Sequence, residues 1–86
     1  MERIYIATAY EIEPIKNEEM ALVEIHGTKE IWKAYFKSWE SILSHYPDYK
    51  TVQKYNKNST GCLYKRKTGQ RSNKDRIIKI ITAKIY

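Results

Sequence analysis

The feature that most constrains the fold is a run of aromatic and aliphatic residues between positions 29 and 46. These side chains recur at intervals of three and four, the spacing that places residues on one face of an α-helix. They are Trp32, Tyr35, Phe36, Trp39, Ile42, Leu43 and Tyr46. Gly27 and Thr28 supply a break and a capping hydroxyl before the run, and Pro47 ends it. The spacing predicts one long amphipathic helix over residues 29–46, which organises the core.

A second, shorter helix is predicted after this proline, over residues 49–57. Asp48 is its candidate N-cap, and Lys50, Lys54 and Lys57 recur at helical spacing on its outer face. The two helices together resemble a helix-turn-helix, a motif whose second helix enters the major groove of DNA. The resemblance departs from the motif at the turn, where Tyr46 and Pro47 replace the usual glycine. Two helices that simply pack together are the alternative interpretation.

Three further segments have the composition of β-strands. Residues 3–13 alternate between two faces and are rich in β-branched and aromatic side chains. Residues 62–67 and 76–86 are predicted as two more strands. Both faces of the last one are largely apolar, so we expect it inside the sheet, paired with residues 3–13.

Residues 17–26 fit two interpretations. Asn17, followed by Glu18 and Glu19, is typical of a capped helix start with acidic residues in its first turn. The same segment also alternates apolar and polar residues as a strand does, and a strand is slightly favoured.

These elements predict a single α+β domain over residues 1–86. Its small antiparallel sheet packs against one long amphipathic helix and a second short helix, in an arrangement similar to a winged helix. The length suits one domain. Cys62 is the single cysteine, so no intramolecular disulfide can form. The sequence predicts no signal peptide and no membrane-spanning segment, and therefore a cytoplasmic protein without a membrane partner.

Charge is distributed unevenly along the chain, whose net charge is +6. Residues 1–30 carry seven glutamates against three basic residues, whereas residues 47–86 carry eleven basic residues against two aspartates. Six of the basic residues fall within positions 65–76, separated by small or amide side chains that can donate hydrogen bonds to phosphate oxygens. An ordinary solvated hairpin loop is the alternative interpretation of this run. The candidate nucleic-acid-binding residues are Lys50, Gln53, Lys54, Lys57, Lys65, Arg66, Lys67, Arg71, Lys74 and Arg76.

The charge pattern favours a small, non-catalytic nucleic-acid-binding protein that contacts the phosphate backbone of DNA or RNA through its basic C-terminal half. The alternative is a virus- or plasmid-encoded inhibitor that binds and occludes a host protein through the acidic N-terminal part. A third hypothesis is a small ribonuclease toxin that uses His26 or His45. The two histidines and the cysteine have no metal-site spacing, so we expect no metal, no cofactor and no catalytic residues.

Overall fold

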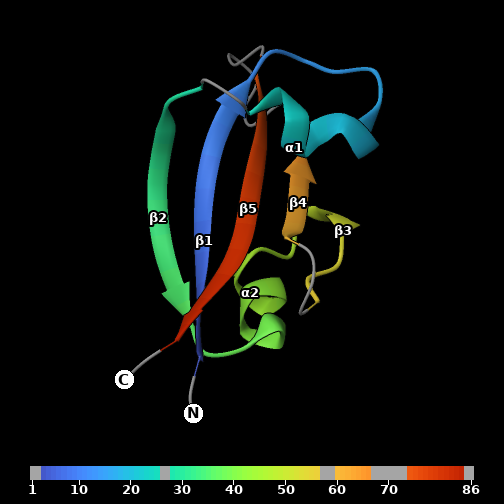
Figure 1. Ribbon diagram of the computed structural model, residues 1–86. Helices are drawn as coiled ribbons and strands as arrows, with labels where there is room; N and C mark the ends of the chain where they lie inside the picture. The colour runs from blue at the N-terminus through green and yellow to red at the C-terminus, as the bar shows by residue number, and fades with distance from the viewer. Residues whose placement is uncertain (1–2, 26–27, 57–59, 67–73, 85–86) are drawn as a thin grey trace.

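The computed structural model describes residues 3–25, 28–56, 60–66 and 74–84. Within them the chain forms one five-stranded antiparallel sheet with the strand order β2-β1-β5-β4-β3, drawn in Figure 1. The strands are β1 (Arg3–Ile12), β2 (Glu30–Phe36), β3 (Lys50–Gln53), β4 (Gly61–Lys65) and β5 (Asp75–Lys84).

The three strands predicted from alternation are confirmed as β1, β4 and β5, with ends that differ by one or two residues. β1 and β5 pair along their whole length, from Arg3 opposite Lys84 to Ile12 opposite Asp75. β5 lies inside the sheet with β1 on one side and β4 on the other, as its two apolar faces indicated. This long central pair is the frame on which the other strands assemble.

The predicted long helix over residues 29–46 is wrong. Its first part forms β2, and only Trp39–His45 is helical, as α2. The aromatic residues fit both periods, since Trp32 and Phe36 are four apart but also lie on the same face of a strand. Aromatic residues favour strands, and β1 supplies a partner for the backbone of β2. Ser38, with extended backbone angles, starts the helix by accepting a hydrogen bond from the amide of Ser41 at 3.1 Å.

The second predicted helix is also wrong, because Lys50–Gln53 is the strand β3, paired with β4. β-Branched Thr51 and Val52 suit a strand better than a helix. Without that helix there is no helix-turn-helix or winged-helix arrangement in the described residues. The α+β prediction is therefore corrected to a fold that is mostly a five-stranded antiparallel sheet with one helix of seven residues.

Helical turns occupy Glu18–Glu24, so the favoured strand interpretation of residues 17–26 is wrong for the residues that the structure describes. A short 3-10 helix, η1 (Glu18–Met20), leads into a four-residue helix, α1 (Ala21–Glu24). The Asn17 side chain accepts a hydrogen bond from the amide of Glu19 at 3.0 Å, and two glutamates occupy the first turn. The capping pattern had identified this alternative correctly.

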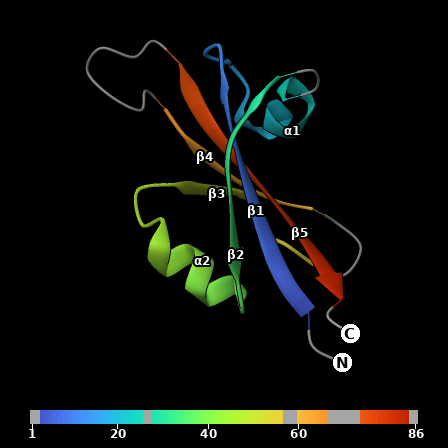
Figure 2. The same cartoon turned by 90° about the vertical axis from the view of Figure 1, so that its left-hand side faces the viewer.

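The sheet buries a hydrophobic cluster on each of its faces. On one face, Ala7, Leu63, Ile78 and Ile80 pack with Ile42 of α2. On the other face, Ile12, Cys62, Tyr64 and Ile77 pack with Ala21 and Ile25 from the α1 segment. Figure 2 shows α1 and α2 on opposite sides of the sheet and toward opposite ends of it. Neither helix is long enough to cover the whole face on which it packs.

None of the helices in the described part of the chain has the length and apolar character needed to cross a membrane.

Candidate binding surface

Three of the ten predicted site residues lie outside the described residues: Lys57, Lys67 and Arg71. The other seven are placed on or beside β3, β4 and β5. They are Lys50, Gln53, Lys54, Lys65, Arg66, Lys74 and Arg76. Most of these do not present a free charge, because the acidic N-terminal part of the chain folds against them.

Glu18 in η1 binds two of the predicted site residues. It accepts a hydrogen bond from the Lys50 ammonium group at 2.8 Å and lies 3.4 Å from the Arg66 guanidinium. The hydrogen bond from Lys50 and the charges of both cations lower the pKa of Glu18, although partial desolvation opposes the shift. Arg66 also donates to the backbone carbonyl of Ile15 at 3.4 Å. Lys50 and Arg66 therefore help to hold the η1 segment against the sheet.

Arg76 lies at the centre of a second polar cluster, on the sheet face that packs against α2. Its guanidinium contacts the Glu11 carboxylate on β1 at 3.2 Å and hydrogen-bonds to Tyr49. Burial disfavours its charge, but these hydrogen bonds outweigh that effect and raise the pKa of Arg76. Opposite it on β4 is Lys65, 4.0 Å from Asp48 and 5.6 Å from the centre of the Tyr49 ring. Arg76 is therefore engaged within the protein, whereas the contacts of Lys65 are longer.

The remaining predicted residues divide into engaged and free side chains. Lys74 lies 3.6 Å from Glu13. Gln53 at the end of β3 donates a hydrogen bond to the backbone carbonyl of Thr60, the residue before β4, at 2.6 Å. Lys54 is exposed and forms no ion pair with the described residues. The structure thus brings the basic residues near one another, but it places a carboxylate beside five of the seven.

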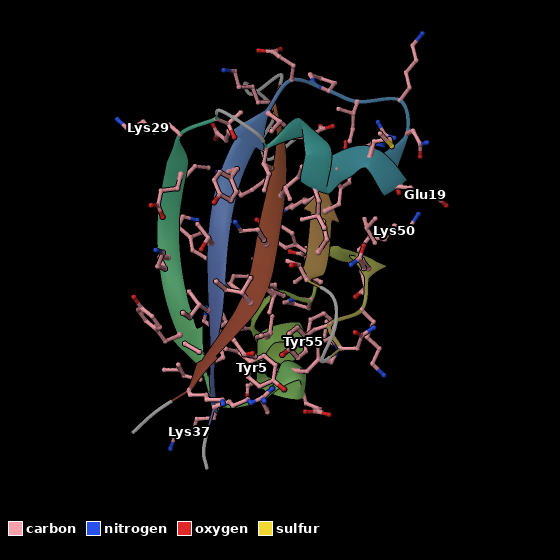
Figure 3. All side chains as sticks on the ribbon, viewed as in Figure 1. Tyr5, Glu19, Lys29, Lys37, Lys50 and Tyr55 are labelled. Atoms are coloured by element: carbon pink, nitrogen blue, oxygen red, sulfur yellow. The ribbon has the colours of Figure 1, made fainter. Side chains whose placement is uncertain are left out.

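The tyrosines among the predicted basic segments serve mainly as packing residues. Tyr64 is 2% exposed, and its hydroxyl group donates a hydrogen bond to the buried Asp75 carboxylate. Burial and this hydrogen bond raise the pKa of Tyr64 to about 12. Tyr46 stacks on Trp32 with ring centres 5.4 Å apart. Tyr55 meets Tyr5 edge-on, with ring centres 5.2 Å apart. Figure 3 labels both residues near the lower end of β5. These rings are committed to the fold.

The residues considered for catalysis do not assemble into a site within the described chain. Cys62 is fully buried, and desolvation raises the pKa of its thiol to about 12. His45, at the end of α2, is exposed and touches the rings of Phe36 and Tyr46. His26 lies outside the described residues. Among the residues described, no three His, Cys, Asp or Glu side chains gather as a metal site would require.

The sheet face that carries α1 has a second surface, which the sequence analysis did not identify. The helix covers only one end of this face, and the other end of β2, β1 and β5 has no helix in front of it in Figure 1. We call this surface the open face. Its residues are Ile4, Ile6, Thr8, Lys33, Tyr35, Lys79, Ile81 and Ala83.

Strand register orders the open face into rows. Tyr35, Ile6 and Ile81 lie side by side across β2, β1 and β5 and form an apolar row. The next row, two residues along and thus ~7 Å away, has Lys33 and Lys79 on either side of the buried Thr8. Tyr35 is 60% exposed and Ile81 39% exposed, which is unusual for large apolar side chains. The open face therefore offers an accessible ring next to two ammonium groups.

The charge of this region is positive and little compensated. Lys33 has Glu30 as its ion-pair partner, at the long distance of 4.0 Å. Lys79 forms no ion pair among the described residues and lies 5.8 Å from the centre of the Tyr10 ring. Lys29 and Lys37 stand at the two ends of β2, as labelled in Figure 3, and both are exposed. Lys33 and Lys79 are thus the lysines of the open face itself, and Lys29 and Lys37 lie beyond the two ends of β2.

The sequence interpretation missed this surface because it treated residues 29–46 as one helix. That assignment placed Tyr35 in the core beside Phe36. In the strand, Lys33 and Tyr35 point away from Trp32 and Phe36. The signal that would have found the open face is the two-residue alternation within Glu30–Phe36.

Comparison with protein-family models, with curated proteins and with solved structures gives no significant match in any of the three.

Proposed function

We propose that this protein binds nucleic acid without catalysing a reaction, and that the open face of the sheet is the contact surface. The observation that carries the proposal is the cluster of weakly compensated lysines at and around β2 and β5, beside an exposed tyrosine. Lysines neutralise phosphates and release counterions, and this term supplies most of the affinity of a non-specific binder. The net charge of +6 supports the same partner.

The proposal moves the main contact away from the basic residues that the sequence analysis selected in residues 47–86. Among those residues, Lys50, Arg66 and Arg76 lie 2.8, 3.4 and 3.2 Å from carboxylates of the protein. Binding phosphate through them would mean giving up these internal ion pairs. Lys33 and Lys79 have no carboxylate this close among the described residues: Lys33 lies 4.0 Å from Glu30, and Lys79 forms no described ion pair. Among the described residues, the lysines of the open face can therefore bind a phosphate at little cost in internal ion pairs.

The salt dependence of binding tests the proposal. If Lys29, Lys33, Lys37 and Lys79 each meet a phosphate, the log–log plot of affinity against salt should have a slope of about −3 to −4. Replacing Lys33 and Lys79 together by glutamine should flatten that slope by about 1.5 and weaken binding to all sequences alike. Fluorescence anisotropy with labelled oligonucleotides at several salt concentrations measures both quantities.

The matched control is Lys50→Gln with Lys54→Gln, which removes the same charge from the region of β3. It should leave the slope nearly unchanged, and thermal unfolding should confirm that both double variants are folded. A larger effect of the control than of the open-face variant would place the contact on the basic half instead. Dissociation constants above ~10⁻⁴ M at low salt, weaker than ordinary non-specific binding, would contradict nucleic-acid binding altogether.

A second candidate function is the binding of a host protein, and the exposed edge of the sheet favours it. β2 is an edge strand, and Ile31 and Tyr35 on it are 43% and 60% exposed. An edge of this kind can pair with a strand of another protein. Affinity purification from the native host, with and without nuclease treatment, separates the two candidates. A protein partner retained after nuclease treatment would favour this second function.

A further inference from the structure

The accessible ring of Tyr35 bears on the kind of nucleic acid that the open face accepts. We infer that the open face takes single-stranded nucleic acid, with an unpaired base stacked on Tyr35 and the neighbouring phosphates on Lys33 and Lys79. This inference rests on the proposed function and specifies its ligand. It depends on three properties of the described residues: the exposure of one ring, the register of two rows, and the shape of the surface around them.

Tyr35 is the most exposed of the large apolar residues in the described chain, at 60%. Its neighbour across β1 is Ile6, and Ile81 follows on β5, so the ring has an apolar surface beside it. Other tyrosines are committed to internal contacts, such as the one between Tyr64 and Asp75. Base stacking on an aromatic side chain is tolerant of sequence, because every base presents a flat face.

The lysine row lies one step along the strands from this ring. Lys33 is two residues from Tyr35 on the same strand, so its side chain starts ~7 Å away on the same face. Lys79 lies two strands across from Lys33, at ~10 Å. A base on Tyr35 would therefore keep its own backbone within reach of both ammonium groups. This spacing lets one nucleotide stack its base on Tyr35 while the lysines neutralise the phosphates next to it.

The surface around the open face does not suit a duplex. Sequence-reading in a duplex requires an element that enters a groove, usually a helix or a two-stranded ribbon. In the described residues the open face is a sheet surface, and α2 packs against the opposite face. Bases within a duplex are already stacked on each other, and so none is available for Tyr35. Single strands offer both the free base and the phosphate.

Two variants at one position, compared with the unmodified protein, test the inference. Tyr35→Leu removes the ring without changing charge, and should weaken binding to a labelled single-stranded DNA or RNA by about five- to 150-fold. Tyr35→Phe keeps the ring and should bind within about twofold of the unmodified protein. The salt slope should be the same for all three proteins, because no phosphate contact is lost. Fluorescence anisotropy with single strands and with the matched duplex gives these values.

The outcomes separate this inference from the proposed function. Binding of both nucleic acids with no preference for single strands, or equal affinity of Tyr35→Leu and the unmodified protein, would overturn the inference and leave nucleic-acid binding in place. No binding of any oligonucleotide at low salt would overturn both. A control variant, Tyr55→Leu, tests an aromatic residue on the opposite face and should not lower affinity in the folded protein. Sedimentation would detect self-association of the protein through the open face. If the self-associated protein did not bind single strands, the inference would likewise be overturned.

Discussion

Tyr64 and Asp75 form a buried pair that links the stability of the protein to pH. Burial and the hydrogen bond to Asp75 raise the pKa of Tyr64 from 10.0 to about 12. A group whose pKa is higher in the folded protein stabilises it fully below the unfolded value. That contribution is lost as the pH rises toward the folded value. The relevant window therefore lies between about pH 10 and pH 12.

We expect the free energy of unfolding to fall across this window. In Tyr64→Phe the fall should be smaller, and the protein should be less stable at neutral pH because Asp75 loses this hydrogen bond. Cys62 shifts in the same direction, from 9.0 to about 12, so Cys62→Ala is needed beside it to separate the two groups. Denaturant unfolding at a series of pH values measures the effect. An unchanged pH profile in Tyr64→Phe would mean that this hydroxyl is not the group responsible.

At the scale of the element, α2 is held against the sheet by a close approach at one glycine. A Cβ added at Gly61 would lie 2.8 Å from a ring carbon of Trp39 in α2 and 3.1 Å from the Cβ of Tyr55. Side chains that are forced into a packed contact of this kind cost roughly 1–3 kcal/mol. Gly61 on β4 is therefore a point of close approach between the Trp39 ring of α2 and the sheet.

Gly61→Ala should lower the free energy of unfolding by about 1–3 kcal/mol. Trp39→Phe replaces the indole by a smaller ring. In that background, Gly61→Ala should lower the free energy of unfolding by less than it does in the unmodified protein. Denaturant unfolding of the four proteins completes the cycle. Additive costs would show that the ring of Trp39 is not what the new methyl group meets.

The elements also show what the sequence could and could not predict. β1 and β5 were recognisable because each has ten residues with a consistent two-residue alternation or two apolar faces. Residues 30–45 were not, because aromatic spacing of four fits both a helix and one face of a strand. One deciding feature was non-local, the presence of β1 as a partner for β2, and the other was a local cap, Ser38, in the middle of the run.

The candidate site was only partly predictable for the same reason. The sequence identifies its cations, but not the carboxylates that fold against them. Glu18 and Lys50 are 32 positions apart, Glu18 and Arg66 are 48 apart, and Glu11 and Arg76 are 65 apart. No local pattern reports such pairs. The open face was hidden as well, because it exists only when β2, β1 and β5 lie side by side.

At the scale of the whole molecule, the fold depends on contacts between distant parts of the chain. The two central strands join the segment that begins at Arg3 with the segment that ends at Lys84. Sheets of this kind, rich in long-range pairs, refold in about milliseconds to seconds. The β1–β5 pair is expected to form in the rate-limiting step, since β2 and β4 each need one of these strands as a partner.

Two conservative core variants test this order of events. Ile78→Val in β5 and Ile42→Val in α2 each remove one methylene from a fully buried side chain, at a cost of about 0.5–1.5 kcal/mol. Ile78→Val should slow refolding, whereas Ile42→Val should mainly speed unfolding. Stopped-flow measurements of both rates decide the matter. Equal slowing of refolding by both variants would show that α2 docks at the same time as the central strands pair.

The position of the two ends of the central pair has a mechanical consequence. Arg3 and Lys84 are directly opposite each other, and the described chain ends side by side at the bottom of Figure 1. A force that pulls these two points apart acts along the hydrogen bonds between β1 and β5, which run perpendicular to the strands. The force is then carried by one pair of opposite residues at a time. A molecule pulled at these two points would separate β1 from β5 one residue pair at a time, starting at Arg3 and Lys84. A molecule pulled at Arg3 and Asp75 would instead load all the hydrogen bonds between the two strands together.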